Sequence, residues 1–255
     1  MNTVSVRSLL VRGMLAGLAA GCPALLVAYL LGEPSVDRAI GYEEAHSHGD
    51  HGVELVSRTL QSTGGLATGV LVYGVALGGI AALAFCVALG RIGRIGRIGP
   101  RATAALLSLG GLLVVHVVPF LKYPANPPSV GDPDTIGKRT ALYFLMIVLS
   151  VLLGVAAIFL GRGLVPRLGG WWAGVVAVAA FVLVVGAAYA VLPVVDEVPA
   201  DFPATMLWRF RLAALAVQGV LWAGFGLLFG HLAERLLVPR AGHDRSARGT
   251  AEPVS

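Results

Sequence analysis

The stretch ALYFLMIVLSVLLGVAAIFLG, residues 141–161, contains no charged, histidine or amide side chain. A helix of about 20 apolar residues crosses the roughly 30 Å of hydrocarbon in a bilayer. Similar apolar runs occupy residues 8–31, 66–89, 102–121, 171–193 and 212–233. Together they predict an all-α polytopic integral membrane bundle of about six transmembrane helices, with residues 1–237 as a single transmembrane domain.

The overall composition supports a membrane protein. Of the 255 residues, 56% are hydrophobic and 13% are charged, and the mean hydropathy is +0.81. A water-soluble globular domain carries about 25% charged residues, so this chain lacks the polar surface that such a domain needs. The formal charge of +5 does not indicate nucleic-acid binding, because the basic residues lie at helix ends, where membrane topology accounts for them.

The distribution of charge sets the expected orientation. With the N-terminus in the cytoplasm, the inner segments hold 12 of the 19 Lys and Arg residues, and the outer segments hold 11 of the 14 acidic residues. Because excess Lys and Arg mark cytoplasmic loops, we expect both termini in the cytoplasm of a multi-pass protein of the bacterial plasma membrane. Residues 32–63 are then an outer loop, and 238–255 a disordered cytoplasmic tail.

The predicted outer loop contains EEAHSHGDHG, residues 43–52, which is rich in histidine and acidic side chains. Imidazole and carboxylate together suit cobalt, nickel, zinc and copper ions. Gly49 and Gly52 argue against a rigid helix, and in an extended chain His46 and His48 would point to the same side. The alternative is a solvated polar loop. The candidate ligands are Glu43, Glu44, His46, His48, Asp50 and His51.

His116 is the histidine that lies well inside a predicted span, about five residues from its outer end. An ionisable side chain at such depth is a functional hypothesis by default, so His116 joins the candidate metal ligands. The alternative is a neutral imidazole bonded to a neighbouring helix.

Catalysis has no positive signal in the sequence. We find no serine–histidine–acid set, no HExxH zinc motif and no dinucleotide-binding glycine pattern after a strand. We therefore expect no enzyme activity, no catalytic residues and no permanently bound cofactor.

Several motifs resemble the CbtA family, the large membrane subunit of a predicted cobalt transporter. They are GEPSVDRAI (32–40), VSRTLQSTGGL (56–66), YGVALGG (73–79), the long loop at 119–143 and VPADFPATMLWRFR (198–211). The resemblance covers nearly the whole chain. It implies uptake of cobalt for corrinoid (vitamin B12) synthesis, and a partner, CbtB, that is a small single-helix protein with a His-rich segment.

The sequence thus leads to one hypothesis with an alternative. The chain is a membrane transporter subunit for uptake of cobalt(II) or a similar divalent metal ion, embedded in the lipid bilayer with a CbtB-like partner. The alternative is a non-transporting scaffold that docks a separate metal carrier. A homo-oligomer is compatible with either function.

Overall fold

The structure is a computed structural model, and it describes residues 3–46, 57–92, 98–128, 130–131 and 134–238. The regular elements among these residues are all helical. In order, they are α1 (Thr3–Val27), the π-helical segment η1 (Ala28–Gly32) and α2 (Glu33–His46); α3 (Arg58–Leu60), η2 (Gln61–Gly65) and α4 (Leu66–Ile92); α5 (Pro100–Gly111), η4 (Leu112–Val117) and α6 (Val118–Lys122); α7 (Ile136–Val191); and α8 (Ala204–Leu237).

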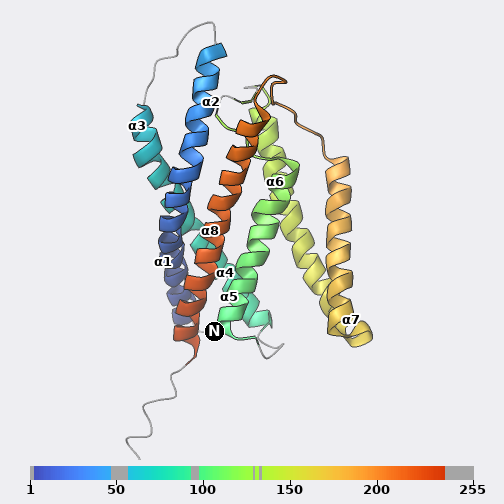
Figure 1. Cartoon of the computed structure of the whole chain (residues 1–255). Coiled ribbons are helices and arrows are strands. Elements are labelled where there is room, and N and C mark those ends of the chain that lie inside the picture. The colour runs from blue at the N-terminus through green and yellow to red at the C-terminus, as the bar shows by residue number, and fades with distance from the viewer. Residues whose placement is uncertain (1–2, 47–56, 93–97, 129, 132–133, 239–255) are drawn as a thin grey trace, which may run out of the picture.

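The described residues contain five helices that are long and apolar enough to cross a membrane. One of them, α7, has 56 residues and changes direction at Gly169, where φ is 74° and ψ is 165°. Glycine adopts such a positive φ readily because it has no Cβ. Figure 1 shows that the two halves of α7 run in opposite directions. Each half exceeds the roughly 20 residues that a crossing needs, so the predicted all-helical membrane fold is confirmed.

The connections between helices gather at two ends of the bundle. The start of α1, the end of α4, the start of α5, the bend of α7 and the end of α8 lie at one end in Figure 1, while α2 and α3 lie at the other. The first end is the one that the sequence assigns to the cytoplasm. Almost all of the predicted tail, residues 239–255, lies outside the described residues.

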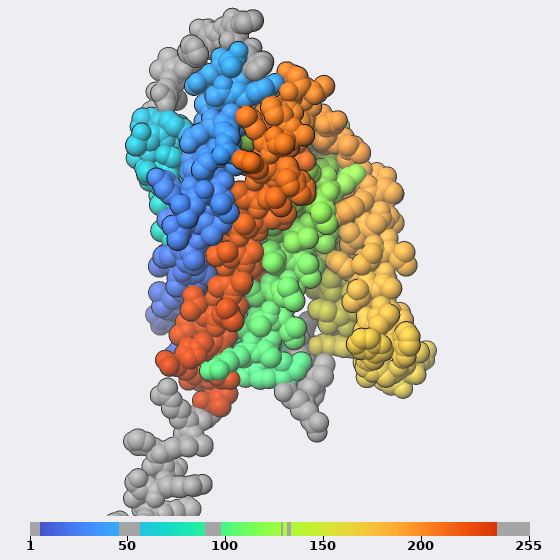
Figure 2. Space-filling view, viewed as in Figure 1, coloured from blue at the N-terminus to red at the C-terminus, as the bar shows by residue number. Residues whose placement is uncertain are grey.

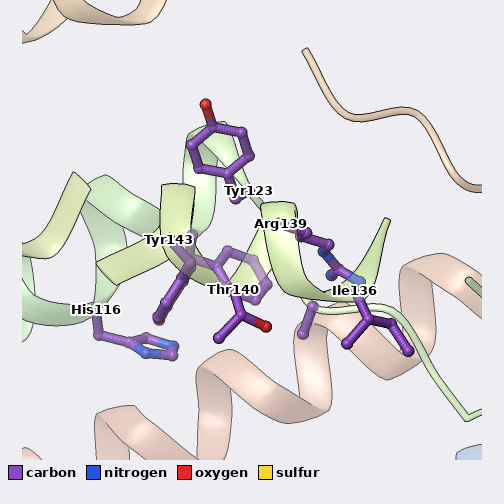
Figure 3. Close-up of a pocket in the computed structure, with 8 residues that line it drawn as sticks. His116, Tyr123, Ile136, Arg139, Thr140 and Tyr143 are labelled. Atoms are coloured by element: carbon purple, nitrogen blue, oxygen red, sulfur yellow. The ribbon is translucent and has the colours of Figure 1, made fainter. Parts of the chain in front are cut away.

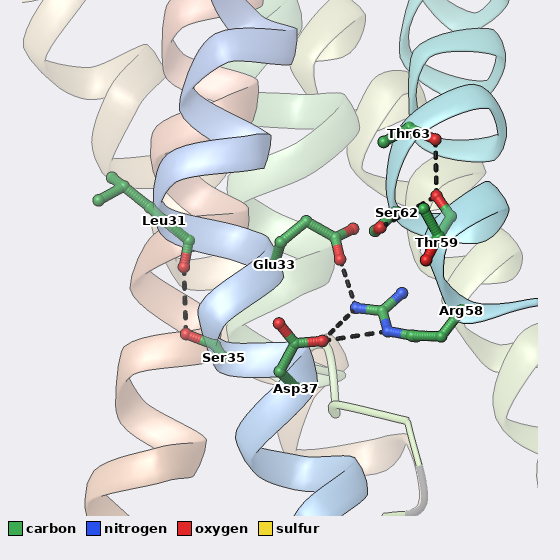
Figure 4. A network of polar contacts seen from close by, with 8 residues as sticks. All are labelled: Leu31, Glu33, Ser35, Asp37, Arg58, Thr59, Ser62 and Thr63. Atoms are coloured by element: carbon green, nitrogen blue, oxygen red, sulfur yellow. Dashed lines mark hydrogen bonds and ion pairs between the residues drawn. The ribbon is translucent and has the colours of Figure 1, made fainter.

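The segment 32–63, which we expected to be a loop, begins and ends with helix. Residues Glu33–His46 form α2, and η1 joins it to α1 without a break. Ion pairs with Arg58 stabilise this extension beyond the apolar run. Arg58 donates from Nη2 to Asp37 Oδ1 at 2.8 Å and also pairs with Glu33 (Figure 4). His46 is the last residue of this helix, whereas the nearby glycines had argued against a rigid helix in this part of the sequence.

The π-helical segments η1, η2 and η4 each lie beside a hydroxyl that bonds a backbone carbonyl. The Ser35 hydroxyl donates to Leu31 O at 3.1 Å near η1, and the Thr63 hydroxyl donates to Thr59 O at 2.6 Å at η2 (Figure 4). Ser150 of α7 donates to Val114 O of η4. A π-helical turn disturbs the regular ladder of backbone bonds, and a carbonyl without a partner is costly in hydrocarbon. The hydroxyls therefore help to stabilise these irregular turns.

The helices α1 and α4 approach each other through glycine. A Cβ added to Gly17 would lie 2.0 Å from Gly74 O, and one added to Gly78 would lie 2.2 Å from Gly13 O. Small residues four apart let membrane helices pack backbone against backbone. This contact places α4 firmly against α1.

The largest buried cluster lies among α1, α4, α5 and α8. Phe85, Phe225 and Phe229 are fully buried in it, and the ring of Phe229 lies 5.0 Å from that of Phe85 and 5.1 Å from that of Phe225, centroid to centroid. In contrast, α7 packs on η4 and α6 through a separate cluster that includes Met146 and Val185. In Figure 2, α7 forms one side of the molecule.

The bend at Gly169 predicts which side each part of α7 faces. Single cysteines are introduced into a variant without native cysteines, either as Ala200→Cys in the loop after α7 or as Gly170→Cys at the bend. We expect a membrane-impermeant thiol reagent to label the Ala200→Cys protein on intact cells, and the Gly170→Cys protein only after permeabilisation. Both positions are exposed in the structure. Labelling of G170C from outside would contradict the predicted topology.

The glycine contact predicts a stability effect. The substitution Gly17→Ala forces α1 and α4 apart, so it should lower the stability by about 1–3 kcal/mol, as overpacking does in other proteins. Gly69→Ala is the matched control, because nothing lies within 4 Å of its added Cβ. The midpoint of thermal aggregation in detergent measures both, and equal midpoints would contradict the packing role.

Candidate functional site

The structure separates the predicted metal ligands into two places. Glu43 and Glu44 are exposed near the outer end of α2, and His46 is the last residue of that helix. His48, Asp50 and His51 lie outside the described residues. His116 lies in η4, a different element. Within the described part of the chain, no group of three or more His, Cys, Asp or Glu residues could hold a metal ion.

His116 lines a pocket of about 260 Å³ between η4, α6, the following loop and the first turns of α7. Its Nε2 atom is buried and has no hydrogen-bond partner. The imidazole ring lies 5.4 Å from the ring of Phe120, centroid to centroid. Figure 3 shows the imidazole pointing toward the side chains of Thr140 and Tyr143. A nitrogen in this setting is available to a ligand that enters the pocket.

Arg139 on α7 is a charged residue in the lining of the pocket. Its Nη1 atom donates to Glu197 Oε2 at 3.0 Å, and its Nη2 atom donates to Pro124 O at 2.6 Å. The Glu197 side chain is 2% exposed and also accepts a hydrogen bond from Thr135. Because the carboxylate balances the guanidinium, the pocket wall has little net positive charge to repel a cation.

The end of α6 and the loop that follows it are held by hydrogen bonds to neighbouring segments. Lys122 Nζ donates to Tyr189 O at 2.7 Å, and the Tyr123 hydroxyl donates to Pro193 O at 2.9 Å. Burial raises the pKa of Tyr123, so its hydroxyl stays a neutral donor. Arg211 of α8 donates to Ala125 O at 3.2 Å and to Asn126 Oδ1 at 3.1 Å. The pocket therefore has an ordered outer rim.

The acidic outer surface is smaller than the sequence suggests. Glu33, Asp37 and Glu197 form ion pairs with arginine, and Asp201 accepts a hydrogen bond from the Tyr42 hydroxyl at 2.9 Å. These pairs hold the loops and helices of this end together.

Sequence reasoning identified His116 but missed its neighbours in the pocket. Arg139 and Tyr143 are four residues apart, so they lie on the same face of α7, and this spacing was a detectable signal. Their proximity to His116 depends on how the helices pack, which the sequence pattern does not show.

The fold and the site together define a multi-pass α-helical membrane protein that has a pocket at one end of two of its spans, lined by apolar side chains together with His116, Arg139 and Thr140. Residues 6–234 match the family model of CbtA, described as "probable cobalt transporter subunit". The chain therefore belongs to the CbtA family. No curated protein and no solved structure matches it.

The ion pair beside the pocket predicts a large difference between two adjacent acids. Glu197→Ala leaves the Arg139 guanidinium without its carboxylate, so it should destabilise the protein by about 2 kcal/mol or more. Asp196→Ala is the matched control, because Asp196 is exposed and surface changes cost about 0.5 kcal/mol or less. Thermal unfolding in detergent compares them. A Glu197→Ala protein as stable as the control would rule out this role.

Proposed function

We propose that this chain is the membrane subunit that carries cobalt(II), or a similar divalent metal ion, into the cell across the bacterial plasma membrane, and that the imported ion supports corrinoid synthesis. Membership of a family of cobalt transporter subunits supports the class of ion. The observation that carries the proposal is the unpartnered Nε2 atom of His116, a residue that lies inside the span Pro100–Lys122 and lines a pocket at its end.

The proposed order of events follows the two groups of candidate ligands. Glu43, Glu44, His46, His48, Asp50 and His51 collect the ion at the outer surface. His116 then receives it in the pocket. A nitrogen ligand from imidazole suits cobalt, nickel and zinc better than magnesium or calcium, so the pocket favours the first group of ions.

A second function has its own supporting observation. No cluster of three candidate ligands occurs among the residues that the structure describes. This feature favours a scaffold that docks a separate metal carrier, such as a small CbtB-like protein with one helix and a His-rich segment. In that case the carrier moves the ion and this chain supplies its place in the membrane.

Uptake of radiolabelled cobalt tests the proposal. Changing His46, His48 and His51 together to Ala should reduce uptake by about tenfold at limiting cobalt, because the loop contributes to capture of the ion. At high cobalt the uptake of this variant should return to the wild-type rate. His116→Ala should reduce uptake at both concentrations, because every ion passes it. About tenfold corresponds to the loss of one interaction of moderate strength.

His231→Ala is the control, because His231 lies at the other end of the bundle, where its Nδ1 atom is 3.3 Å from Arg101 Nη2. Wild-type uptake in the His116→Ala protein would refute the role of the pocket. Flux into liposomes with and without the partner separates the two functions, because a scaffold moves no cobalt alone while the partner co-purifies with it.

A further inference from the structure

The bend of α7 carries an exposed group of aromatic and basic side chains. Trp171 and Trp172, near the start of its second half, are 77% and 62% exposed, whereas Trp222 in the core of the bundle is 4% exposed. Consecutive residues of a helix point about 100° apart, so one neighbouring helix does not cover both rings. Arg167 is exposed just before the bend, and Arg162 is half-buried a little further back. These two arginines and two tryptophans are called the bend surface below.

The charge on the α7 hairpin has one sign. Helix α7 contains Lys138, Arg139, Arg162 and Arg167 but no acidic residue. Lys138 and Arg139 lie in its first turn, and Arg139 is paired with Glu197. Arg162 and Arg167 form no ion pair with another residue that the structure describes. The bend surface therefore holds two positive charges that the described part of the protein does not balance.

The bend belongs to a polar level of the membrane. The break at Gly169 interrupts the helix, and backbone groups at a helix end lack helical partners. Such groups are costly in hydrocarbon, so the bend lies among the headgroups, where tryptophan is also enriched. Arg162 precedes Gly169 by about 10 Å along the helix. Its long side chain can reach the headgroups while its apolar stem stays among the acyl chains.

The rest of the bundle leaves this surface uncovered. Outside the hairpin, α7 packs mainly on η4 and α6, which comprise residues 112–122. Figure 1 shows α6 well away from the bend, and in Figure 2 the bend forms an exposed corner of the molecule. The end of the hairpin that contains Gly169 therefore depends on its surroundings for further contacts.

We propose that the bend surface binds anionic phospholipids of the leaflet around it, which is the cytoplasmic leaflet in the predicted topology. Lipid phosphate balances Arg162 and Arg167, since a guanidinium can form two parallel hydrogen bonds with a phosphate. The rings of Trp171 and Trp172 lie between the headgroups and the acyl chains. Exposed tryptophan beside arginine, without acidic residues, is typical of a membrane–water boundary, so the composition favours lipid over a protein partner.

Thermal unfolding of the purified full chain in neutral detergent, with phosphatidylglycerol or phosphatidylcholine added, tests the proposal. A ligand that binds the folded protein raises the midpoint of unfolding. Phosphatidylglycerol should therefore raise it by about 3 °C or more beyond phosphatidylcholine. Arg162→Gln with Arg167→Gln should remove most of this difference. Lys138→Gln with Arg209→Gln is the matched control, because it removes two exposed positive charges outside the bend surface and should keep the difference.

Each variant is compared with itself in the two lipids, so a general loss of stability does not imitate the effect. Equal midpoints of the wild-type protein in the two lipids overturn the proposal. An equal loss in the two double variants also overturns it, because the lipid would then respond to total charge.

Quenching of tryptophan fluorescence by lipids brominated on their acyl chains is a second measurement that leaves the arginines in place. In phosphatidylcholine vesicles that hold the full chain, a small fraction of brominated phosphatidylglycerol should quench more than the same fraction of brominated phosphatidylcholine. Trp171→Phe with Trp172→Phe should lose this excess. Trp208→Phe should keep it, because Trp208 is exposed near the start of α8, at a distance from the bend.

Equal quenching by the two brominated lipids overturns the proposal. A midpoint that rises with the partner subunit through Arg162 and Arg167, but not with phosphatidylglycerol, assigns the surface to a protein and overturns it as well. Neither measurement contains cobalt, so failure here leaves the proposed uptake function standing, and failure of uptake leaves the lipid surface standing.

Discussion

Backbone amides in hydrocarbon have no water to bond, and the rest of this structure depends on how they find partners within the protein. Regular helices satisfy most of them internally. At η1, η2 and η4 the ladder changes period, and hydroxyls of Ser35, Thr63 and Ser150 bond nearby carbonyls. Ser150 comes from another helix, so this bond also joins α7 to η4. His116 belongs to η4, and the irregular turn that carries it is therefore held in place from the side.

The fold was largely predictable because the hydrophobic effect of the bilayer acts on length and composition. The six apolar runs correspond to the helices, including both halves of α7. The helix Glu33–His46 was not predictable from hydropathy, since it lies beyond the apolar run and contains Pro34 and Gly41. Contacts from distant residues stabilise it: Arg58 binds its acids, and the ring of Tyr42 lies 5.2 Å from that of Phe202, centroid to centroid.

The candidate site was predictable only where one residue stood out by itself. His116 is conspicuous because a single imidazole interrupts an apolar run. Arg139 and Glu197 are far apart in sequence and are expected in loops or at helix ends, so their pairing beside the pocket follows from packing alone. Residue type suggested the kind of chemistry, whereas the arrangement of helices decides which groups can act together.

The hydrogen bonds that hold the α7 hairpin to the rest of the bundle are unevenly distributed along it. Its bonds to the rest of the bundle, from Ser150, Tyr189 and the loop that receives Tyr123, occur in the half away from Gly169. A hairpin that is held at one end can move most at its other end. Tilting of the hairpin would therefore widen the end of the molecule that holds Gly169, while the rim around the pocket kept its shape.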